Sequence, residues 1–520
     1  MRPSPLEVER VHLSSKASTL LVWGGTVKTA FLVTCLFFLS ATCNVAGFAS
    51  KSSAPVRIQV VADRPFGTEW IPDQTLNQYS DLAVKWLRDY LRINTTNPPG
   101  NEQKSAEFFK ALFDAEGIEN QLLEFAPGRA NIWAHMPCAL PSKECGRPII
   151  LLNHMDVVTA EASHWRVPPF SAAIVGGSIY GRGAQDMKKE GIVQALVLVM
   201  LSRERVQLSR DVIFLATADE EVDNVGSKWI IQNRRDLLRN AEYLITEGGE
   251  NSLGNSGVEY VGIDVAEKAP FWLHVVAHGH AGHGSQPSDD SAPDRLIAAL
   301  QKITDFRPEL RLTPVVEAYL RAMAPLQSQT RAQQFLNIRY MLQDQQTREQ
   351  FRADGSLGYM LQDTLAVTML GGASQTNVIP DEAWANVDVR LLPGSDPQQL
   401  LDNLRKAVND PNVTIEPLKG FVRSNESPTN TELWDTIRAA SKRYFDNAPL
   451  VPFLTTGYTE SQLYRELGIV CYGFSPYRQN IEESGTEHGD NERVRVDEVR
   501  QAPRVLYDVV VRIAGGRPNF

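Results

Sequence analysis

The sequence of 520 residues predicts an α/β protein in which a doubly wound domain carries a smaller, inserted α+β domain. Uninterrupted apolar runs of strand length, at 147–158 and 211–218, are typical of strands buried on both faces of a parallel sheet. Helical apolar periodicity alternates with such runs up to about position 266. After that position, strands alternate apolar and polar residues, which indicates a second sheet with one solvated face.

The doubly wound domain is expected in two parts, 76–266 and 387–520. Its helices show apolar residues at helical spacing, and Gly117 ends one of them. Its strands are short apolar runs that end in polar loops. The expected elements are helices at 76–93 and 105–118, a strand at 147–158, a helix at 190–205, a strand at 211–218, a helix at 226–238, a strand within 241–249 and a C-terminal helix at 497–515.

The inserted domain is predicted over 267–386. Residues 269–279 alternate like a half-solvated strand, and 292–303 form an amphipathic helical pattern. A second alternating stretch occupies 383–394, and an amphipathic helix follows at 396–408. The chain is therefore expected to return to the first domain between about 387 and 400.

The first 49 residues form a separate segment. Residues 29–49 are nearly uncharged and follow Arg10, Lys16 and Lys28, an arrangement typical of an export signal. Small residues suit cleavage after Ala49, and an uncleaved run of this length would anchor the protein in a membrane. We expect an exported protein, periplasmic or secreted, with a signal peptide or membrane anchor at 1–49 and a linker at 50–75. A buried helix is the alternative, which the polar sequence after the run disfavours.

The cysteines and the net charge limit other classes of function. Cys138 and Cys145 flank a short loop, where a disulfide of an exported protein and two free thiols are equally open. Cys471 lies in an apolar run and is expected to be a buried thiol. The net charge is −10 and no basic stripe is present in the sequence, so nucleic acid is not expected as a partner.

Adjacent acids, Asp219, Glu220 and Glu221, follow the apolar run at 211–218. One acid at a strand end is ordinary solvation, whereas three in succession repel one another unless a positive charge lies among them. A metal ion would supply that charge. Its other ligands are then expected at the same edge of the sheet.

Further candidate ligands also follow predicted strands. His154 and Asp156 share a face of the strand at 147–158, as a metal-binding imidazole and the carboxylate that holds it would. Asp186 lies in a glycine-rich loop, and Glu247 ends another strand, at the edge where α/β sheets form their sites. A satisfied core histidine or a solvated acid explains each residue alone, but explains the whole set poorly.

The sequence resembles the M20 family of co-catalytic zinc peptidases and aminoacylases over roughly 75–515. The matching motifs, in the family's order, are "NHMDVV", "YGRGAQDMKKEG", "TADEE", "TEGG", "GHGSQP", "TNVIP", "VDVRLLPG" and "HGDNERV". The stretch "TLAVTMLGGASQTNVIP" is most similar to the branch of carboxypeptidase S and PM20D1-like enzymes. The resemblance implies a catalytic domain with an inserted lid and dimerisation domain, and a homodimer.

The resemblance also implies two Zn²⁺ per chain, with Co²⁺ and Mn²⁺ as alternatives. His154, Asp186 and Glu247 would bind one ion. Asp186, Glu221 and His488 would bind the other, so that Asp186 bridges the pair. Imidazole and carboxylate ligands suit zinc.

Other roles implied by the family belong to catalysis and substrate binding. Asp156 would orient the first histidine ligand, and Glu220 would be the general base toward a metal-activated water. His283, reaching across a dimer, and Asn377 would stabilise the oxyanion. Arg390 would bind the substrate carboxylate through its guanidinium fork, with an edge-strand salt bridge as its alternative role.

The implied reaction is hydrolysis of the amide bond next to a free C-terminal carboxylate, as in an M20-type carboxypeptidase. An N-acyl amino acid, fatty-acyl included, fits the same zinc chemistry, so an aminoacylase is the alternative to a peptidase. A binding protein without turnover is disfavoured, because every ligand and the base are present. The family stretch Gly-x-Thr-Asp-x-Arg departs here to "GYTESQLYR", with Glu460 for Asp and Gln462 for the nearby Arg. We therefore expect a different substrate-facing loop.

Overall fold

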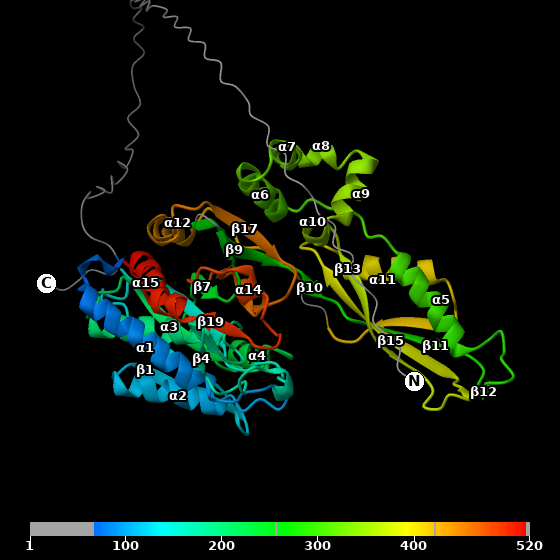
Figure 1. The fold of residues 1–520 in the computed structure, drawn as a ribbon, viewed down its shortest axis with the longest axis horizontal. Coiled ribbons are helices and arrows are strands. Elements are labelled where there is room, and N and C mark those ends of the chain that lie inside the picture. The colour runs from blue at the N-terminus through cyan, green and yellow to red at the C-terminus, as the bar shows by residue number, and fades with distance from the viewer. Residues whose placement is uncertain (1–66, 255–256, 421–422, 516–520) are drawn as a thin grey trace, which may run out of the picture. The chain divides into compact units, whose positions relative to one another are not determined.

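The computed structural model describes residues 67–254, 257–420 and 423–515 (Figure 1). The predicted signal peptide or anchor at 1–49 and most of the predicted linker at 50–75 lie outside these ranges. The described end of that linker holds the 3-10 helix η1 (Gly67–Trp70) and the start of α1 (Asp73–Leu91), so regular structure begins earlier than predicted. Every helix within the described ranges is too short or too polar to cross a membrane.

A nine-stranded sheet forms the larger layer. Its strands are β1 (Glu119–Ala126), β2 (Arg129–Met136), β3 (Gly146–His154), β6 (Arg210–Thr217), β7 (Tyr243–Thr246), β8 (Asn251–Gly254), β9 (Gly257–Glu267), β17 (Leu450–Thr455) and β18 (Val470–Gly473). The strand order is β1-β2-β6-β3-β7-β18-β9-β17, and β8 pairs with β9. The central strands β6, β3, β7 and β18 run parallel, as their continuous apolar runs predict.

Helices cover both faces of this sheet. They are α2 (Gln103–Ala115), α3 (Lys188–Arg203), α4 (Val225–Asn233), α12 (Glu432–Tyr444), α13 (Ser461–Arg465) and α15 (Val496–Ile513), together with α1. Ile149 and Leu151 of β3 belong to the core that α1, α3 and α15 close, and these helices lie side by side (Figure 1). Ile150 and Leu152 belong to the opposite core, with α4 and α13. This period of two confirms the predicted doubly wound fold.

A smaller antiparallel sheet has its own core. Its strands are β10 (Ala269–Pro270), β11 (Leu273–His278), β13 (Thr364–Gly371), β15 (Glu382–Leu391) and β16 (Val413–Pro417), in the order β10-β15-β11-β16 with β13 also paired to β15. The helices α5 (Ala292–Asp305) and α11 (Pro397–Val408) pack on it. The inserted α+β architecture that the alternating strands predict is therefore present.

The predicted end of the insertion at 386 is wrong in position, because it falls inside β15. The sheet continues to β16, and α11 packs on it rather than on the first domain. In the other direction, α6 (Pro314–Met323) lies within the predicted insertion but packs on β17 of the larger sheet. Periodicity identifies a strand or helix, but the sheet it joins is decided by pairing with residues distant in sequence.

The remaining elements are short. They are η2 (Ala162–His164), η3 (Arg235–Leu238), η4 (Ala324–Leu326), α7 (Gln329–Leu336), α8 (Ile338–Met341), α9 (Gln345–Ala353), α10 (Gly355–Leu361), α14 (Ile481–Ser484), β4 (Ile174–Val175), β5 (Ser178–Tyr180), β12 (Gly282–His283), β14 (Val378–Ile379) and β19 (Arg493–Arg495). Between β2 and β3, Cys138 and Cys145 form a disulfide, so they are not the two free thiols that the sequence also allowed. Cys471 is a buried free thiol, as predicted.

Candidate metal centre and active site

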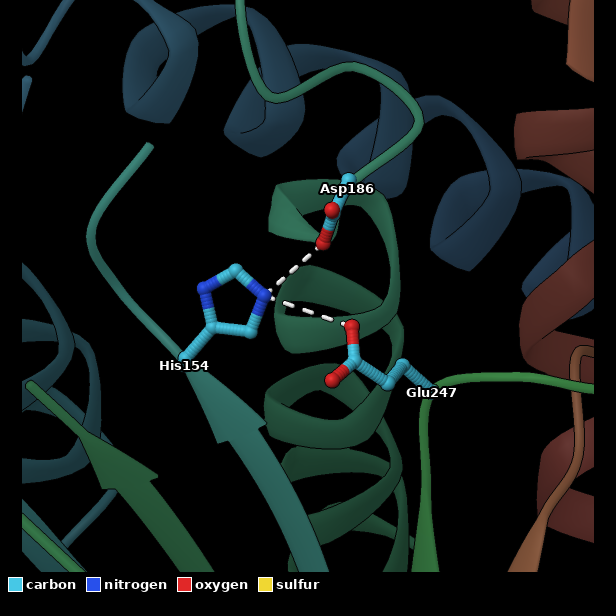
Figure 2. A group of neighbouring side chains, drawn as sticks. All are labelled: His154, Asp186 and Glu247. Carbon is cyan, nitrogen blue, oxygen red and sulfur yellow. Dashed lines mark hydrogen bonds and ion pairs between the residues drawn. The ribbon is translucent and has the colours of Figure 1, made fainter. Parts of the chain in front are cut away.

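The carboxyl ends of the central parallel strands bring the first group of predicted ligands together. His154 is the last residue of β3, Glu247 follows β7, and Asp186 lies in the loop before α3 (Figure 2). His154 Nε2 lies 2.8 Å from Asp186 Oδ1 and 3.3 Å from Glu247 Oε2. This is the edge of a doubly wound sheet where loops leave a crevice.

A second group forms on the other oxygen of Asp186. His488 Nε2 lies 2.8 Å from Asp186 Oδ2 and 3.3 Å from Glu221 Oε2. In each group, the candidate ligand atoms lie within 4.8 Å of one another. Asp186 therefore offers one oxygen to each group, which is the arrangement expected of a bridging ligand.

The donor chemistry of these groups fits two divalent cations. Imidazole nitrogens with carboxylate oxygens suit zinc. Glu221 Oε1 is buried and has no hydrogen-bond partner in the described part of the chain, so an acceptor stays free for a cation. Burial, reinforced by neighbouring carboxylates, raises the pKa values of Glu220, Glu221 and Glu247 above the ordinary glutamate value. Positive charge between the groups would relieve that repulsion.

Both histidines face an excess of negative charge. Hydrogen bonds to Asp186 and Glu221 raise the pKa of His488 to about 10. Burial alone would lower the pKa of His154, but the carboxylates of Glu247 and Asp186 outweigh it and raise that pKa well above its usual value. Each Nε2 therefore lies where a cation is favoured.

Asp156 acts on its surroundings in two ways. His154 Nδ1 lies 3.1 Å from the backbone carbonyl oxygen of Asp156 and 3.6 Å from its carboxylate, so the ring is oriented mainly through the backbone. The Asp156 carboxylate instead accepts hydrogen bonds from the backbone N–H groups of Glu220 and Glu221, at 3.1 and 3.2 Å. Asp156 thus positions the predicted base and a predicted ligand as well as the histidine.

A network that sequence reasoning missed supports the acidic loop after β6. Asp219 has a φ of 72°, in the left-handed region that aspartate tolerates better than most residues. Arg129 Nη2 donates to Asp219 Oδ1 at 2.7 Å and to Glu102 Oε1 at 2.7 Å. Asn97 Nδ2 donates to Asp219 Oδ1 at 2.9 Å and to Asp156 Oδ2 at 2.8 Å. These side chains come from separate segments, so no local pattern marks them.

A buried ion pair joins the loops that carry Asp186 and His488. Arg182 Nη1 lies 2.6 Å from Glu492 Oε2, and both side chains are almost fully buried. Arg182 Nη2 also donates to the carbonyl oxygen of His488 at 3.2 Å, and Glu492 Oε1 accepts from the backbone N–H of Asp186 at 3.2 Å. Arg182 lies in the motif "YGRGAQDMKKEG" and Glu492 in "HGDNERV". These motifs were the only sign in the sequence that could have indicated the pair.

Asp186, Glu221, Glu247 and His488 line a cleft of about 850 Å³, whereas His154 is fully buried and is not among the described residues of that lining. Glu220 lines the same cleft, and so does Arg390 of β15. Arg390 Nε and Nη2 donate to the carboxylate of Asp388, at 2.8 and 3.1 Å. Arg390 therefore takes part in a salt bridge within its strand while its side chain borders the cleft.

His283 and Asn377 lie next to each other, because β12 pairs with β14 and the backbone N–H of Gly284 donates to the carbonyl oxygen of Asn377 at 2.9 Å. Both residues are exposed, and neither is among the described residues that line the cleft. Within one chain, the structure does not bring them to the metal ligands. Their role across a dimer stays a prediction.

The residues that depart from the family pattern do not face the cleft. Glu460 and Gln462 are buried, and Glu460 Oε2 accepts a hydrogen bond from Thr217 Oγ1 at the end of β6, at 2.8 Å. The residues of this loop that do line the cleft are Gly457, Tyr458 and Thr459. The two departures from the family pattern therefore change the buried side of this loop, and not the side that faces the cleft.

Comparison with known proteins agrees with this geometry. The model of peptidase family M20/M25/M40 matches residues 150–512. Aminoacylase-1 of Mus musculus is 26% identical over 422 residues, covering 80% of this chain and 91% of that protein. The human N-fatty-acyl-amino acid synthase/hydrolase PM20D1 is 25% identical over 467 residues, covering 85% of this chain and 89% of that protein.

A similar fold is found in an M20 family metallo-carboxypeptidase from Sulfolobus solfataricus. That structure aligns with a TM-score of 0.63 and 17% identity, over 82% of this chain and 98% of its own. Human carnosine dipeptidase 1 aligns with a TM-score of 0.61 and 15% identity, over 85% of this chain and 98% of its own. Because the family model covers more than half of the chain, the protein belongs to peptidase family M20/M25/M40 and is a metallohydrolase of that family.

Proposed function

We propose that this metallohydrolase is a carboxypeptidase of the M20 type, which cleaves the amide bond next to a free C-terminal carboxylate. The observation that carries the proposal is the pair of ligand groups that share Asp186, with Glu220 in the same cleft. His154 and Glu247 complete one group, and Glu221 and His488 complete the other. Two Zn²⁺ suit these ligands, and Co²⁺ or Mn²⁺ are the alternatives.

Glu220 is the residue that moves the proton. Bound metal ions supply an acidified water and a polarised substrate carbonyl. Glu220 takes a proton from the attacking water on its carboxylate and returns it to the leaving nitrogen. Asp156 keeps the backbone of Glu220 in place through the hydrogen bond of 3.1 Å, so the carboxylate stays directed into the cleft.

Arg390 binds the substrate carboxylate in this proposal. Its Nε and Nη2 atoms are engaged by Asp388, and the Nη1 donors remain for a ligand. His283 and Asn377 would stabilise the oxyanion only from a partner subunit, because they do not border the cleft of their own chain. A homodimer is therefore part of the proposal.

A second candidate function is hydrolysis of N-acyl amino acids. It is favoured by the relatives, because aminoacylase-1 and PM20D1 match this chain over most of its length. Both functions need the same ligands, the same base and the same carboxylate site. They differ in the group that the cleft accepts on the acyl side of the scissile bond.

We also propose that the protein is exported, periplasmic or secreted. The support is the apolar segment 29–49 with its preceding cations, and the disulfide between Cys138 and Cys145, which is typical of an oxidising compartment. N-terminal sequencing of the mature protein distinguishes a cleaved signal peptide from a membrane anchor. A start near residue 50 indicates cleavage, and an intact N-terminus in the membrane fraction indicates the anchor.

The test of the function is hydrolysis of a panel of dipeptides and N-acyl amino acids by the zinc-loaded protein, with Glu220→Gln as the matched control. Turnover that disappears in the variant establishes the amidohydrolase, and the preferred class chooses between the two candidates. Two bound metals per chain without turnover of any substrate would replace the proposal with a binding protein.

A further inference from the structure

Besides the proposed base Glu220, carboxylates that take no part in the metal groups also line the cleft. They are Glu190, Asp223, Glu250, Asp264 and Glu487. For most of them, solvent or a protein partner balances the charge. Glu487 is exposed to solvent. Asp223 pairs with the Lys419 ammonium, Glu250 accepts the Tyr260 hydroxyl at 3.1 Å, and Asp264 accepts the Thr455 hydroxyl. Glu190 is the exception.

Glu190 has an unused acceptor inside the protein. The residue is only 5% exposed, and its Oε2 has no hydrogen-bond partner among the described residues. The other oxygen, Oε1, lies 3.6 Å from Lys189 Nζ and 3.4 Å from Ser475 Oγ. Leaving a buried acceptor unpaired is unfavourable, so an unpaired carboxylate oxygen on a residue that lines a ligand cleft points to a ligand that brings a donor.

Lys189 compensates Glu190 only in part. Its Nζ lies 3.6 Å from Glu190 Oε1, but it donates its hydrogen bond to Gln185 Oε1 and lies 5.0 Å from the centre of the Tyr477 ring. Glu190 Oε2 is left without a hydrogen-bond partner among the described residues. Glu190 lies in the first turn of α3, four residues after the shared ligand Asp186. Burial raises the pKa of Glu190 to about 7, and a cation placed beside it would favour the charged form.

The other cleft residues are consistent with a polar substrate. Charged side chains outnumber apolar ones in the lining, although apolar atoms contribute slightly more of its surface; the apolar side chains are Val222, Pro270, Trp272, Phe453 and Tyr458. A long acyl chain would need a continuous apolar surface, because ligand sites match the polarity of what they bury. An unpaired carboxylate beside such a chain would be costly.

We infer that Glu190 binds an ammonium group on the acyl side of the scissile amide, so that short peptides with a free α-amino group are preferred over N-fatty-acyl amino acids. This inference rests on the proposed function, because the assignment of Arg390 to the substrate carboxylate leaves Glu190 for the other side. A site built to pair with a polar group discriminates strongly against an analogue that lacks it.

The test uses two ligands that differ only in that group, alanyl-phenylalanine and N-propionyl-phenylalanine. Binding to the zinc-loaded Glu220→Gln protein is measured by titration calorimetry, so that the result does not depend on turnover. We expect the dipeptide to bind about tenfold more tightly, and addition of Glu190→Gln to reduce that ratio to near one by weakening the dipeptide alone. Glu250→Gln is the matched control, because its carboxylate lines the same cleft but already accepts the Tyr260 hydroxyl, and it should leave the ratio unchanged.

Equal binding of the two ligands, or a ratio that Glu190→Gln leaves intact, would overturn the inference. Glu190→Asp, which keeps the charge and shortens the side chain, should retain part of the preference and guards against a simple folding defect. The same two ligands are then given to the protein with Glu220 intact. A preserved binding ratio without hydrolysis would refute the proposed function but support the ammonium site at Glu190. Hydrolysis of both ligands at equal efficiency would support the proposed function but refute the ammonium site.

Discussion

Two sets of buried charged side chains meet at the same edge of the larger sheet and are compensated differently. In the ligand groups, the carboxylates around Asp186 face one another and two imidazoles, and their number exceeds the positive charge that the protein provides. In the supporting ion pairs, Glu102 has Arg129 and Glu492 has Arg182. The supporting carboxylates are fully buried, whereas the ligand groups reach the cleft, and only the supporting carboxylates have a protein cation, a guanidinium, as their counter-charge. The first set is built to receive cations, and the second is built to hold its shape without them.

The largest effect is expected from a substitution that removes the general base and leaves both sets of charged side chains in place. Glu220→Gln removes the proton acceptor but keeps the size of the side chain and one acceptor oxygen. We expect kcat to fall by about 10²–10⁴-fold, the usual contribution of a general base. Metal analysis should still find two ions per chain, which separates loss of the base from loss of the centre. A variant with near-normal kcat would remove Glu220 from the mechanism.

The next effect tests the sharing of Asp186. Asp186→Asn weakens both groups at once, whereas Glu247→Gln affects only the first group and Glu221→Gln only the second. Metal content after dialysis should be near zero for the first variant and near one for each of the others. Each lost ion should also remove stabilisation of about 3 kcal/mol at a free metal concentration 100 times its dissociation constant. Melting temperatures with and without a chelator measure that loss, and equal metal content in all three variants would contradict a bridging ligand.

The third effect is expected from disrupting one of the supporting ion pairs. Arg182→Met leaves Glu492 buried without its guanidinium, which should cost about 3–5 kcal/mol in the free energy of unfolding. Urea unfolding of the wild-type and variant apo-proteins gives the difference. The double variant Arg182→Met, Glu492→Gln should recover a large part of it, because no charge is then left unpaired. If the single variant were as stable as the wild type, the pair would not be what holds the two loops.

The smallest effect comes from a buried cation that has no carboxylate hydrogen-bonded to it. Lys268 Nζ donates to the carbonyl oxygens of Tyr359 and Gln362, at 3.2 and 3.0 Å, and to the Thr364 hydroxyl. Burial lowers its pKa from 10.5 to about 8. More distant charges partly offset each other, with Asp363 and Asp388 favouring the ammonium and Arg390 opposing it.

Because the folded protein then binds fewer protons than the unfolded chain between pH 8 and 10.5, its stability should rise with pH in that window. From pH 8 to 9.5 the expected gain attributable to Lys268 is about 1–2 kcal/mol. Urea unfolding at several pH values gives the slope, and Lys268→Met should remove this contribution. A slope that is the same with and without the lysine would show that its pKa is not lowered.

How much of this could be predicted depends on whether a feature is local. The ends of apolar runs located His154 and Glu247 at the sheet edge, because a strand and its following loop are neighbours in sequence. The family resemblance added His488, which no periodicity connects to Asp186. No sequence pattern indicates the ion pair between Arg129 and Glu102, because it forms only when two separate segments come together in the fold.

One error and one omission have the same cause. The boundary at 386 cut β15, because alternation says that a strand is half-buried but not which sheet it joins. The free oxygen of Glu190 was not predicted, since the pattern that indicates a helix at 190–205 does not show which residues pack against its first turn. Whether a charge in that turn is solvated or buried is decided by the residues that pack over it, here Ser475 from the far end of the chain.

The position of β18 and His488 near the C-terminus has a consequence for the order of events during synthesis. His154, Asp186 and Glu247 all lie in the first half of the sequence, so the first ligand group can assemble before the later segments are made. The second group waits for His488, and the strand β18, which lies between β7 and β9, waits with it. A nascent chain stopped before residue 470 would keep an open place in the middle of its main sheet and only one complete set of ligands. Closure of the sheet and completion of the second ligand group therefore both depend on segments that are made after β17.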